Sequence, residues 1–205
     1  PPEVLSTAMR VHQKYFSTLN NQNILSPNFI FVSNSIKDTK RDKTIIEGNE
    51  RVLKARLSDS NFFWKTDLSK SFEFWNRKLK DVVLYENLGS MYDKTIRISK
   101  ISNYFSQAFN VNSSLAEQAS LLSKADLVSE MVGEFPELQG IMGGYFAVEQ
   151  GFDKEIALAV SEHYLPTGLD TKTPKKPFSI ALALTDKIDT LVGFFGIDQK
   201  PTSSK

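Results

Sequence analysis

The spacing of apolar residues is the feature that most constrains the fold of this chain. From about Glu47 almost to the end, apolar side chains recur at intervals of three and four residues. This period places them on one face of an α-helix, whereas a half-buried strand would alternate apolar and polar residues. The pattern predicts a helical bundle, so the fold class that we expect is mainly α.

The first part of the chain has a different pattern. Glu3–Val11 is predicted as a short helix, and Gln13–Leu19 and Asn28–Ser33 are predicted as strands because they are rich in aromatic and β-branched residues. The segment Asn20–Asn23 is predicted as a turn, and the charged run Ile36–Lys43 as a solvated loop. We therefore expect a small α+β portion to precede the helices.

Two predictions within the helical part can be checked residue by residue. Ser114-Leu115-Ala116-Glu117 resembles a capping box, in which a Ser hydroxyl and a Glu side chain satisfy free amides at a helix start. Pro177–Phe195 is predicted as the last helix and as a core element. The apolar stripe expected to face that core comprises Ile180, Leu184, Ile188, Leu191 and Phe195.

These patterns together predict two domains. Residues 1–57 form a partial α+β portion, and residues 58–205 form a helical domain. The chain starts with Pro1-Pro2-Glu3-Val4, without an initiator Met or a signal-peptide pattern, so we expect an internal segment of a longer protein.

Composition narrows the chemistry that the chain can perform. The absence of cysteine excludes disulfides and thiolate metal sites, and it favours a cytoplasmic origin. No apolar run is long enough to span a membrane. A phosphate-binding glycine loop and a Gly-x-Ser-x-Gly nucleophile motif are both missing from the sequence. We therefore expect no catalytic residues, no metal ligands and no cofactor within this chain.

The histidines and the paired carboxylates are the remaining candidates for catalysis. His12 and His163, the two histidines, lie far apart in the sequence, which argues against a multi-histidine metal cluster. His163 is better explained as a polar anchor at a helix end than as a ligand. Asp186 and Asp189 are three residues apart, so a helix places both on one face, where they could act in acid/base catalysis. A structural pair is the favoured interpretation.

A nucleic-acid contact is the other candidate function. Residues 1–57 hold nine Lys and Arg against five Asp and Glu. Within them, Arg51 and Lys54 lie one helical turn apart and could neutralise phosphates. Arg56 is a third candidate, although its position well around the helix also fits packing or an interdomain salt bridge. An ordinary amphipathic helix explains the same spacing equally well.

Several strings of residues resemble one family along nearly the whole chain. They run in the order found in the β subunit of the bacterial two-subunit glycyl-tRNA synthetase. The strings are Glu3–Leu5, Met9–Phe16, Glu47–Leu57, Glu86–Lys94, Leu121–Leu127, Met131–Gly143, Glu162–Pro166 and Asp186–Ile197.

This resemblance implies a role in a cytoplasmic α2β2 enzyme that attaches glycine to tRNA(Gly) with ATP and Mg²⁺. The aminoacylation site of that enzyme lies on the α subunit, so the present segment would assist tRNA binding without catalysing the reaction. Its expected partners are the α subunit and tRNA(Gly), with no membrane.

The helical part also resembles a degenerate HD domain, the fold of metal-dependent phosphohydrolases. Asp186 matches the last Asp of the HD motif, and His163 is a further vestigial position. Ser123-Lys124 stands where His-Asp is expected, and Arg97 lies near the place of the first His. A lysine ammonium would repel a metal cation, so the resemblance implies a scaffold that contacts the acceptor arm of tRNA.

Two alternatives remain open from the sequence. The chain could be an active HD-type metal-dependent phosphohydrolase that keeps His163 and Asp186 as ligands. It could also be an architectural spacer between the α subunit and distant β-subunit domains.

Overall fold

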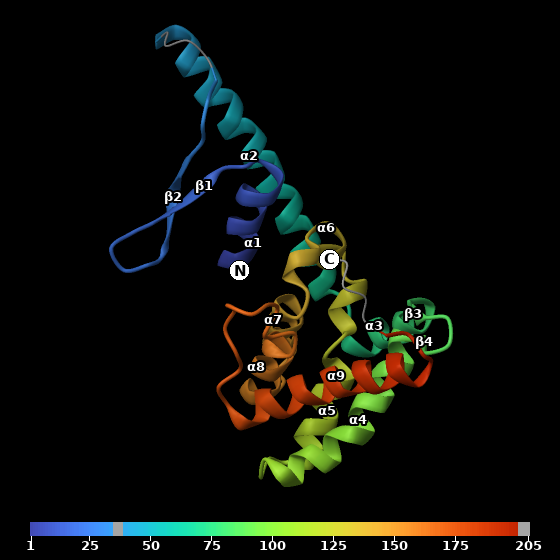
Figure 1. The fold of residues 1–205 in the computed structure, drawn as a ribbon. Coiled ribbons are helices and arrows are strands. Elements are labelled where there is room, and N and C mark those ends of the chain that lie inside the picture. The colour runs from blue at the N-terminus through green and yellow to red at the C-terminus, as the bar shows by residue number, and fades with distance from the viewer. Residues whose placement is uncertain (35–38, 201–205) are drawn as a thin grey trace. The chain divides into compact units, whose positions relative to one another are not determined.

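The computed structural model describes residues 1–34 and 39–200. Packing divides the chain into two compact units, Pro1–Asp67 and Leu68–Lys205. The bulk of the chain is helical, which confirms the predicted mainly α class (Figure 1). Residues 57 and 58 both lie inside one helix, α2. The division between the two compact units falls after Asp67, further along the sequence than the expected domain boundary. The assignment of residues 1–57 and 58–205 as domains stays a prediction.

The first unit contains a short helix, a hairpin and most of a long helix. Its elements are α1 (Pro2–Thr7), a π-helical turn (Ala8–His12), β1 (Phe16–Leu19), β2 (Leu25–Ile30) and α2 (Thr39–Leu68). The strands are antiparallel, with Phe16 opposite Ile30, and the Asn23 amide donates to the Asn20 carbonyl in the predicted turn. Of the expected loop Ile36–Lys43, residues 36–38 lie outside the described residues. The prediction is wrong for residues 39–43, which form the start of α2, where Lys43 pairs with Glu47 one turn later.

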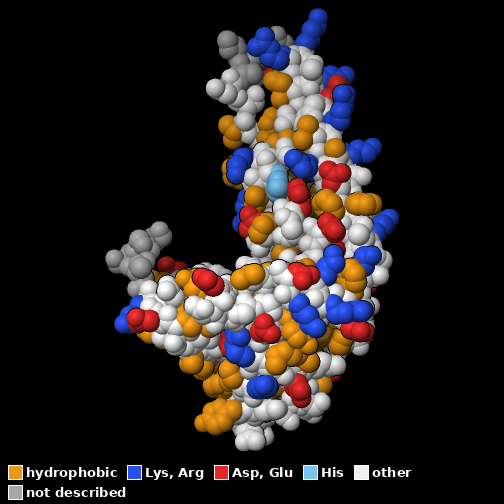
Figure 2. Space-filling view, turned by 90° about the vertical axis from the view of Figure 1, so that its right-hand side faces the viewer, with side chains coloured by type: hydrophobic (Ala, Val, Ile, Leu, Met, Phe, Trp, Pro, Cys, Tyr) orange, Lys and Arg blue, Asp and Glu red, His pale blue; other side chains and the backbone are white. Residues whose placement is uncertain are grey.

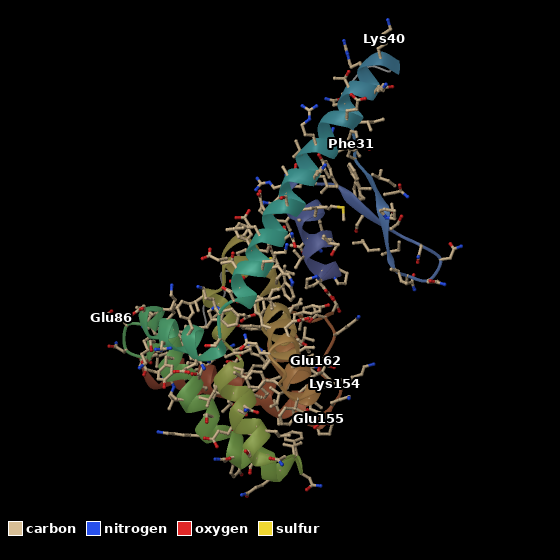
Figure 3. All side chains as sticks on the ribbon, turned by 180° about the vertical axis from the view of Figure 1, so that it is seen from behind. Phe31, Lys40, Glu86, Lys154, Glu155 and Glu162 are labelled. Atoms are coloured by element: carbon tan, nitrogen blue, oxygen red, sulfur yellow. The ribbon has the colours of Figure 1, made fainter. Side chains whose placement is uncertain are left out.

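A small aromatic core joins the hairpin to α2. Met9, Tyr15 and Leu53 are buried together, and the Tyr15 ring stacks on Phe29 with centroids 4.9 Å apart. The Tyr15 hydroxyl donates a hydrogen bond to Asn49 of α2. Phe31 lies beside α2 and packs against the same core (Figure 3). This burial explains why the short hairpin, which is only marginally stable in water, holds its place on the helix.

The second unit is a bundle of helices. Its elements are α3 (Phe72–Lys78), the 3₁₀ turn η2 (Leu79–Asp81), β3 (Val83–Tyr85), β4 (Gly89–Ser90), α4 (Met91–Ala108), α5 (Ser113–Leu122), η3 (Ala125–Val128), α6 (Glu130–Glu134), η4 (Pro136–Leu138), α7 (Ile141–Glu149), α8 (Lys154–Glu162) and α9 (Pro177–Gly196). Helix α4 packs against α5 and α9, while α8 packs against α5, α7 and α9 (Figure 1). Trp75 and Phe146 meet in its core with ring centroids 4.8 Å apart.

The helix starts differ in part from those predicted. Helix α5 begins one residue before Ser114, and the Asn112 side chain caps it by accepting from the amides of Ser114 and Leu115. The predicted capping box at Ser114 is therefore wrong, because a better acceptor precedes it. A capping box does form at the start of α4, where Ser90 and Asp93 satisfy each other's amides.

The last helix turns a different face inward from the one predicted. Leu184, Leu191 and Phe195 are 36%, 54% and 52% exposed, so the expected stripe does not face the core. Residues of the opposite face are buried instead, among them Thr185, Asp186 and Asp189. The buried face also carries Phe178, Ala181 and Leu182, so its burial removes apolar surface from water. Both carboxylates of that face pair with cations inside the bundle, which offsets the cost of burying them. Within residues 1–34 and 39–200, no helix combines the length and apolar character that a membrane crossing requires.

Candidate functional site

The centre of the helical unit is a buried lysine. Lys124, between α5 and η3, places its ammonium 2.8 Å from His163 Nε2 and 3.0 Å from Asp186 Oδ2. The same ammonium lies 3.8 Å from the centre of the Tyr164 ring, a cation–π distance. Burial lowers the pKa of Lys124 to about 8, and the Asp186 carboxylate opposes that shift. Lys124 therefore carries its positive charge near neutral pH.

His163, which contacts the Lys124 ammonium, is a neutral imidazole. It follows α8 and is fully buried, with Nδ1 only 2.6 Å from the Val160 carbonyl oxygen. Because the Lys124 ammonium can only donate, Nε2 accepts from it, and Nδ1 carries the proton that is donated to Val160. Burial and the nearby Lys124 charge together lower the pKa of His163 to about 3. His163 is consequently a hydrogen-bond acceptor here.

Asp186 connects Lys124 to a second buried cation. Burial alone would raise its pKa, but the charge and hydrogen bond of Lys124, together with the charge of Lys94, outweigh that effect and lower the pKa of Asp186 to about 2. Lys94 of α4 lies 3.1 Å from Asp186 Oδ1. The three N–H donors of Lys94 go elsewhere, to Asp189 Oδ2, Thr190 Oγ1 and the Asp186 carbonyl. Its attraction to the Asp186 carboxylate is therefore electrostatic.

A bidentate pair extends the network to the surface. Arg97 Nε lies 2.7 Å from Asp189 Oδ1, and Arg97 Nη2 lies 3.2 Å from Asp189 Oδ2. The remaining contact of Arg97 is to the Leu88 carbonyl, at 3.0 Å. Cations and carboxylates thus alternate along the network and join α4 to α9. Their order is Lys124, Asp186, Lys94, Asp189 and Arg97. This pattern pairs both buried aspartates with cations, which offsets the cost of burying their charge, although Asp186 Oδ1 accepts no hydrogen bond.

The structure brings together four of the five positions identified in the sequence. Arg97, Lys124, His163 and Asp186 belong to one network, whereas the buried Ser123 hydroxyl makes a local hydrogen bond to the Ser120 carbonyl. Lys94 was missed in the sequence. Its spacing of three residues from Arg97 on a predicted helix was the one available signal, because both side chains then share a face.

Asp126 is a second buried group that the sequence did not reveal. Its Oδ2 atom accepts from the amides of Gly140 and Gly143, at 2.6 and 2.9 Å, and so caps the start of α7. Burial raises the pKa of Asp126 to about 6, and these two amides limit the shift. The carboxylate acts as a distant helix cap, and its contacts cross a stretch of sequence too long for a local motif.

The residues proposed to contact RNA lie on α2. Arg51 and Lys54 are exposed, while Arg56 is half-buried. Figure 2 shows Lys and Arg side chains, in blue, spaced along the surface of the unit that contains α2 (Figure 2). No contact among the described residues assigns Arg51 or Lys54 a function.

The fit of a divalent metal can be tested at the HD-like positions. Among residues 1–34 and 39–200, no group of three or more His, Asp or Glu side chains is arranged to hold a metal ion. The Lys124 ammonium lies between His163 and Asp186, so a cation that used both as ligands would meet a like charge within bonding distance. These residues do not fit a metal centre.

Comparison with known proteins identifies the family. A family profile described as glycyl-tRNA synthetase beta subunit matches residues 1–205. The chain is 45% identical to the glycine–tRNA ligase beta subunit of Pseudomonas fluorescens (strain SBW25), over 100% of the chain and 30% of that relative. Identity to the corresponding subunit of Paracoccus denitrificans (strain Pd 1222) is also 45%, with the same shares of both chains. The chain thus spans about 30% of the length of these curated relatives. Because the profile covers every residue, the chain belongs to the glycyl-tRNA synthetase beta subunit family.

Proposed function

We propose that this segment works within glycine–tRNA ligase as a tRNA-engaging part of the β subunit that performs no chemistry itself. Membership of the family supports a role in attaching glycine to tRNA(Gly). In this proposal, the α subunit of a cytoplasmic α2β2 enzyme carries the aminoacylation site and uses ATP and Mg²⁺. The segment adds binding surface for tRNA.

The position of Lys124 is the observation that carries the non-catalytic part of the proposal. An HD phosphohydrolase needs a metal ion to activate water and to stabilise the phosphate charge. Here an ammonium contacts the two side chains, His163 and Asp186, that would serve as ligands. Lys94 adds a second positive charge 3.1 Å from Asp186. The side chains around Lys124 therefore form a closed ion-pair network. In this proposal Arg97, Ser123, Lys124, His163 and Asp186 are the vestigial positions of an HD scaffold.

The exposed cations of α2 support the RNA part of the proposal. Arg51 and Lys54 project from a long helix into solvent, one turn apart, with no buried role to fill. Charges in this arrangement can follow a phosphate backbone, and binding would depend on the release of counterions. Arg56, half-buried on the same helix, would contribute from the edge of that surface.

A titration of tRNA(Gly) into the 205-residue chain at several salt concentrations tests this proposal. We expect weak binding that falls steeply with salt, and the double variant Arg51→Ala/Lys54→Ala should reduce the salt slope by about 2, roughly one for each lost phosphate contact. The matched control is the double variant Lys154→Ala/Lys172→Ala, which also removes two exposed positive charges. Equal slopes for both variants would reject the assignment of α2, and absence of binding would favour an architectural spacer.

An assay of metal-dependent hydrolysis tests the non-catalytic part separately. The chain is incubated with Mn²⁺ or Mg²⁺ and with nucleotide and phosphodiester substrates. We expect no turnover above the buffer rate. Turnover that Asp186→Ala abolishes would instead establish the alternative, an active HD-type phosphohydrolase.

A further inference from the structure

Positive charge is concentrated at the start of the helical unit. Residues 70–80 hold four Lys and Arg against one Glu, whereas residues 81–205 hold eleven against sixteen. Lys70 and Lys78 of the basic segment are exposed, and no carboxylate of the described residues lies within ion-pair distance of either ammonium. Two cations that no acid neutralises attract a polyanion to this part of the surface.

One aromatic ring lies beneath both of these charges. The Lys70 ammonium lies 5.3 Å and the Lys78 ammonium 5.2 Å from the centre of the Phe74 ring, which are cation–π distances. The two charges are therefore no further apart than the sum of these distances, within reach of neighbouring phosphates on one strand. The attraction of the ring for both ammonium groups opposes their mutual repulsion. We call these two residues the ring-held lysines.

The backbone around the ring-held lysines is fixed by packing. Gln150, which follows α7, accepts a hydrogen bond from the Phe72 amide at 3.3 Å and donates one to the Lys70 carbonyl at 3.0 Å. On the inner side of α3, Trp75 is only 1% exposed. A lysine that binds a phosphate loses rotamer freedom, which weakens binding. Because the ring and the fixed backbone already restrict these side chains, less freedom is lost when they bind.

The neighbouring cations have acidic residues close to them. Arg77 pairs with Glu73 at 3.6 Å. Lys80 lines a surface hollow together with Glu86 and Asp93. We therefore assign neither cation to the site, which consists of the ring-held lysines and the ring itself.

We propose that Lys70 and Lys78, held by Phe74, form a phosphate-binding site for tRNA on the helical unit. This inference rests on the tRNA-engaging function proposed above and adds a second contact to that of α2. RNA fits the lysines better than a protein partner does, because Lys is depleted at interfaces between proteins, whereas Lys and Arg make many of the contacts to phosphates. A contact to the backbone holds tRNA in place without reading its sequence.

A titration of tRNA(Gly) into the 205-residue chain, followed by fluorescence anisotropy at several salt concentrations, tests this site. Lys70→Ala/Lys78→Ala removes two phosphate contacts, so the plot of log affinity against log salt should become shallower by about 2. The control Lys154→Ala/Lys172→Ala removes two exposed charges of the same unit and should leave this slope nearly unchanged.

Phe74→Leu tests the role of the ring, because it keeps both charges. We expect the affinity to fall about threefold or more at every salt concentration, with the slope unchanged, since the lysines keep their phosphate contacts but lose their support. Phe109→Leu is the matched control. Phe109 is half-buried in the same unit, and among the described residues no ammonium lies over its ring, so this variant should bind like the wild type. Circular dichroism checks that every variant keeps its helices.

The outcomes separate this site from the function on which it rests. If Lys70→Ala/Lys78→Ala keeps the wild-type slope while Arg51→Ala/Lys54→Ala reduces it, the ring-held lysines are rejected and the α2 contact stands. If the wild-type chain does not bind tRNA(Gly), both proposals fail. Wild-type affinity in Phe74→Leu would overturn the role of the ring. Polyglutamate that binds as tightly as tRNA(Gly), and loses this binding in Lys70→Ala/Lys78→Ala, would assign the lysines to an acidic protein instead.

Discussion

Replacing Lys124 by Met tests whether the buried ammonium holds the helical unit together. The substitution keeps an unbranched side chain of similar length but removes the charge that contacts His163 and Asp186. Removing one partner of a buried ion pair costs about 3–5 kcal/mol, because the other charge stays buried. Asp186 keeps Lys94 at 3.1 Å, so we expect a loss near the lower limit, about 3 kcal/mol.

Urea unfolding at pH 7 measures this loss, since Lys124 is charged at that pH. Trp75 lies in the core of the helical unit, and Trp64→Phe removes the fluorescence of the other unit, so one signal reports the unfolding free energy of interest. The matched control is Lys200→Met. Lys200 lies 3.1 Å from Asp198, but both side chains are largely exposed, so this change should cost less than about 1 kcal/mol.

A double-mutant cycle separates the ion pair from loss of packing. The variant Lys124→Met/Asp186→Asn removes both charges, so its cost should be smaller than the sum of the single costs by about 2 kcal/mol. Additive costs, or a Lys124→Met variant as stable as the wild type, would refute the ion-pair account. The structural importance of Lys124 would then lie in its carbon chain alone.

The remaining predictions concern pH and two glycines. The folded pKa of His163, about 3, is below its ordinary value of 6.5, so the unfolded state binds more protons and stability falls as pH drops through this window. As the pH falls, the unfolding free energy of His163→Gln should drop by up to about 1.4 kcal/mol less per pH unit than that of the wild type, as measured by urea unfolding. Comparing the two proteins cancels the opposite effect of Asp126, and identical pH profiles would contradict the prediction. Gly48→Ala should stabilise α2 by about 0.5–1 kcal/mol in thermal unfolding, because its added methyl meets nothing within 4 Å. Gly144→Ala should destabilise the helical unit, because its methyl would lie 2.8 Å from the Ala157 carbonyl oxygen of α8, and a stable variant would disprove this close approach.

The periodic patterns of the sequence determined the local structure. The helical second part, the turn at Asn20–Asn23 and the presence of a strand on each side of it follow from short-range spacing and residue type. The bounds of the second strand were wrong, because β2 spans Leu25–Ile30 and not Asn28–Ser33. The same reasoning gives no signal for the division between the two compact units, which falls inside α2. Helix propensity continues through the charged residues 39–43 and through Leu57, so nothing local marks where one unit ends.

The candidate site was foreseen only in part. The resemblance to an HD domain predicts an acid at position 124, where the sequence has lysine, and repulsion of a metal was expected from this alone. The sequence cannot show that the Lys124 ammonium contacts His163 and Asp186, which are 39 and 62 residues away along the chain. Lys94 and Asp126 escaped notice for the same reason, since their partners come from distant helices.

The orientation of α9 shows most clearly what the sequence alone determines and what only the tertiary structure decides. Its sequence determines a helix with an apolar stripe, and by that criterion Leu184 and Leu191 should be inside. Tertiary structure decided otherwise, because the face that carries Phe178, Ala181 and Leu182 packs inside the bundle. There Asp186 and Asp189 find their partners Lys124, Lys94 and Arg97, whose positions are set by other parts of the chain. Local periodicity measures how apolar one face is. It carries no information about the packing and the charged partners that other parts of the chain bring to the opposite face, which is the one that is buried.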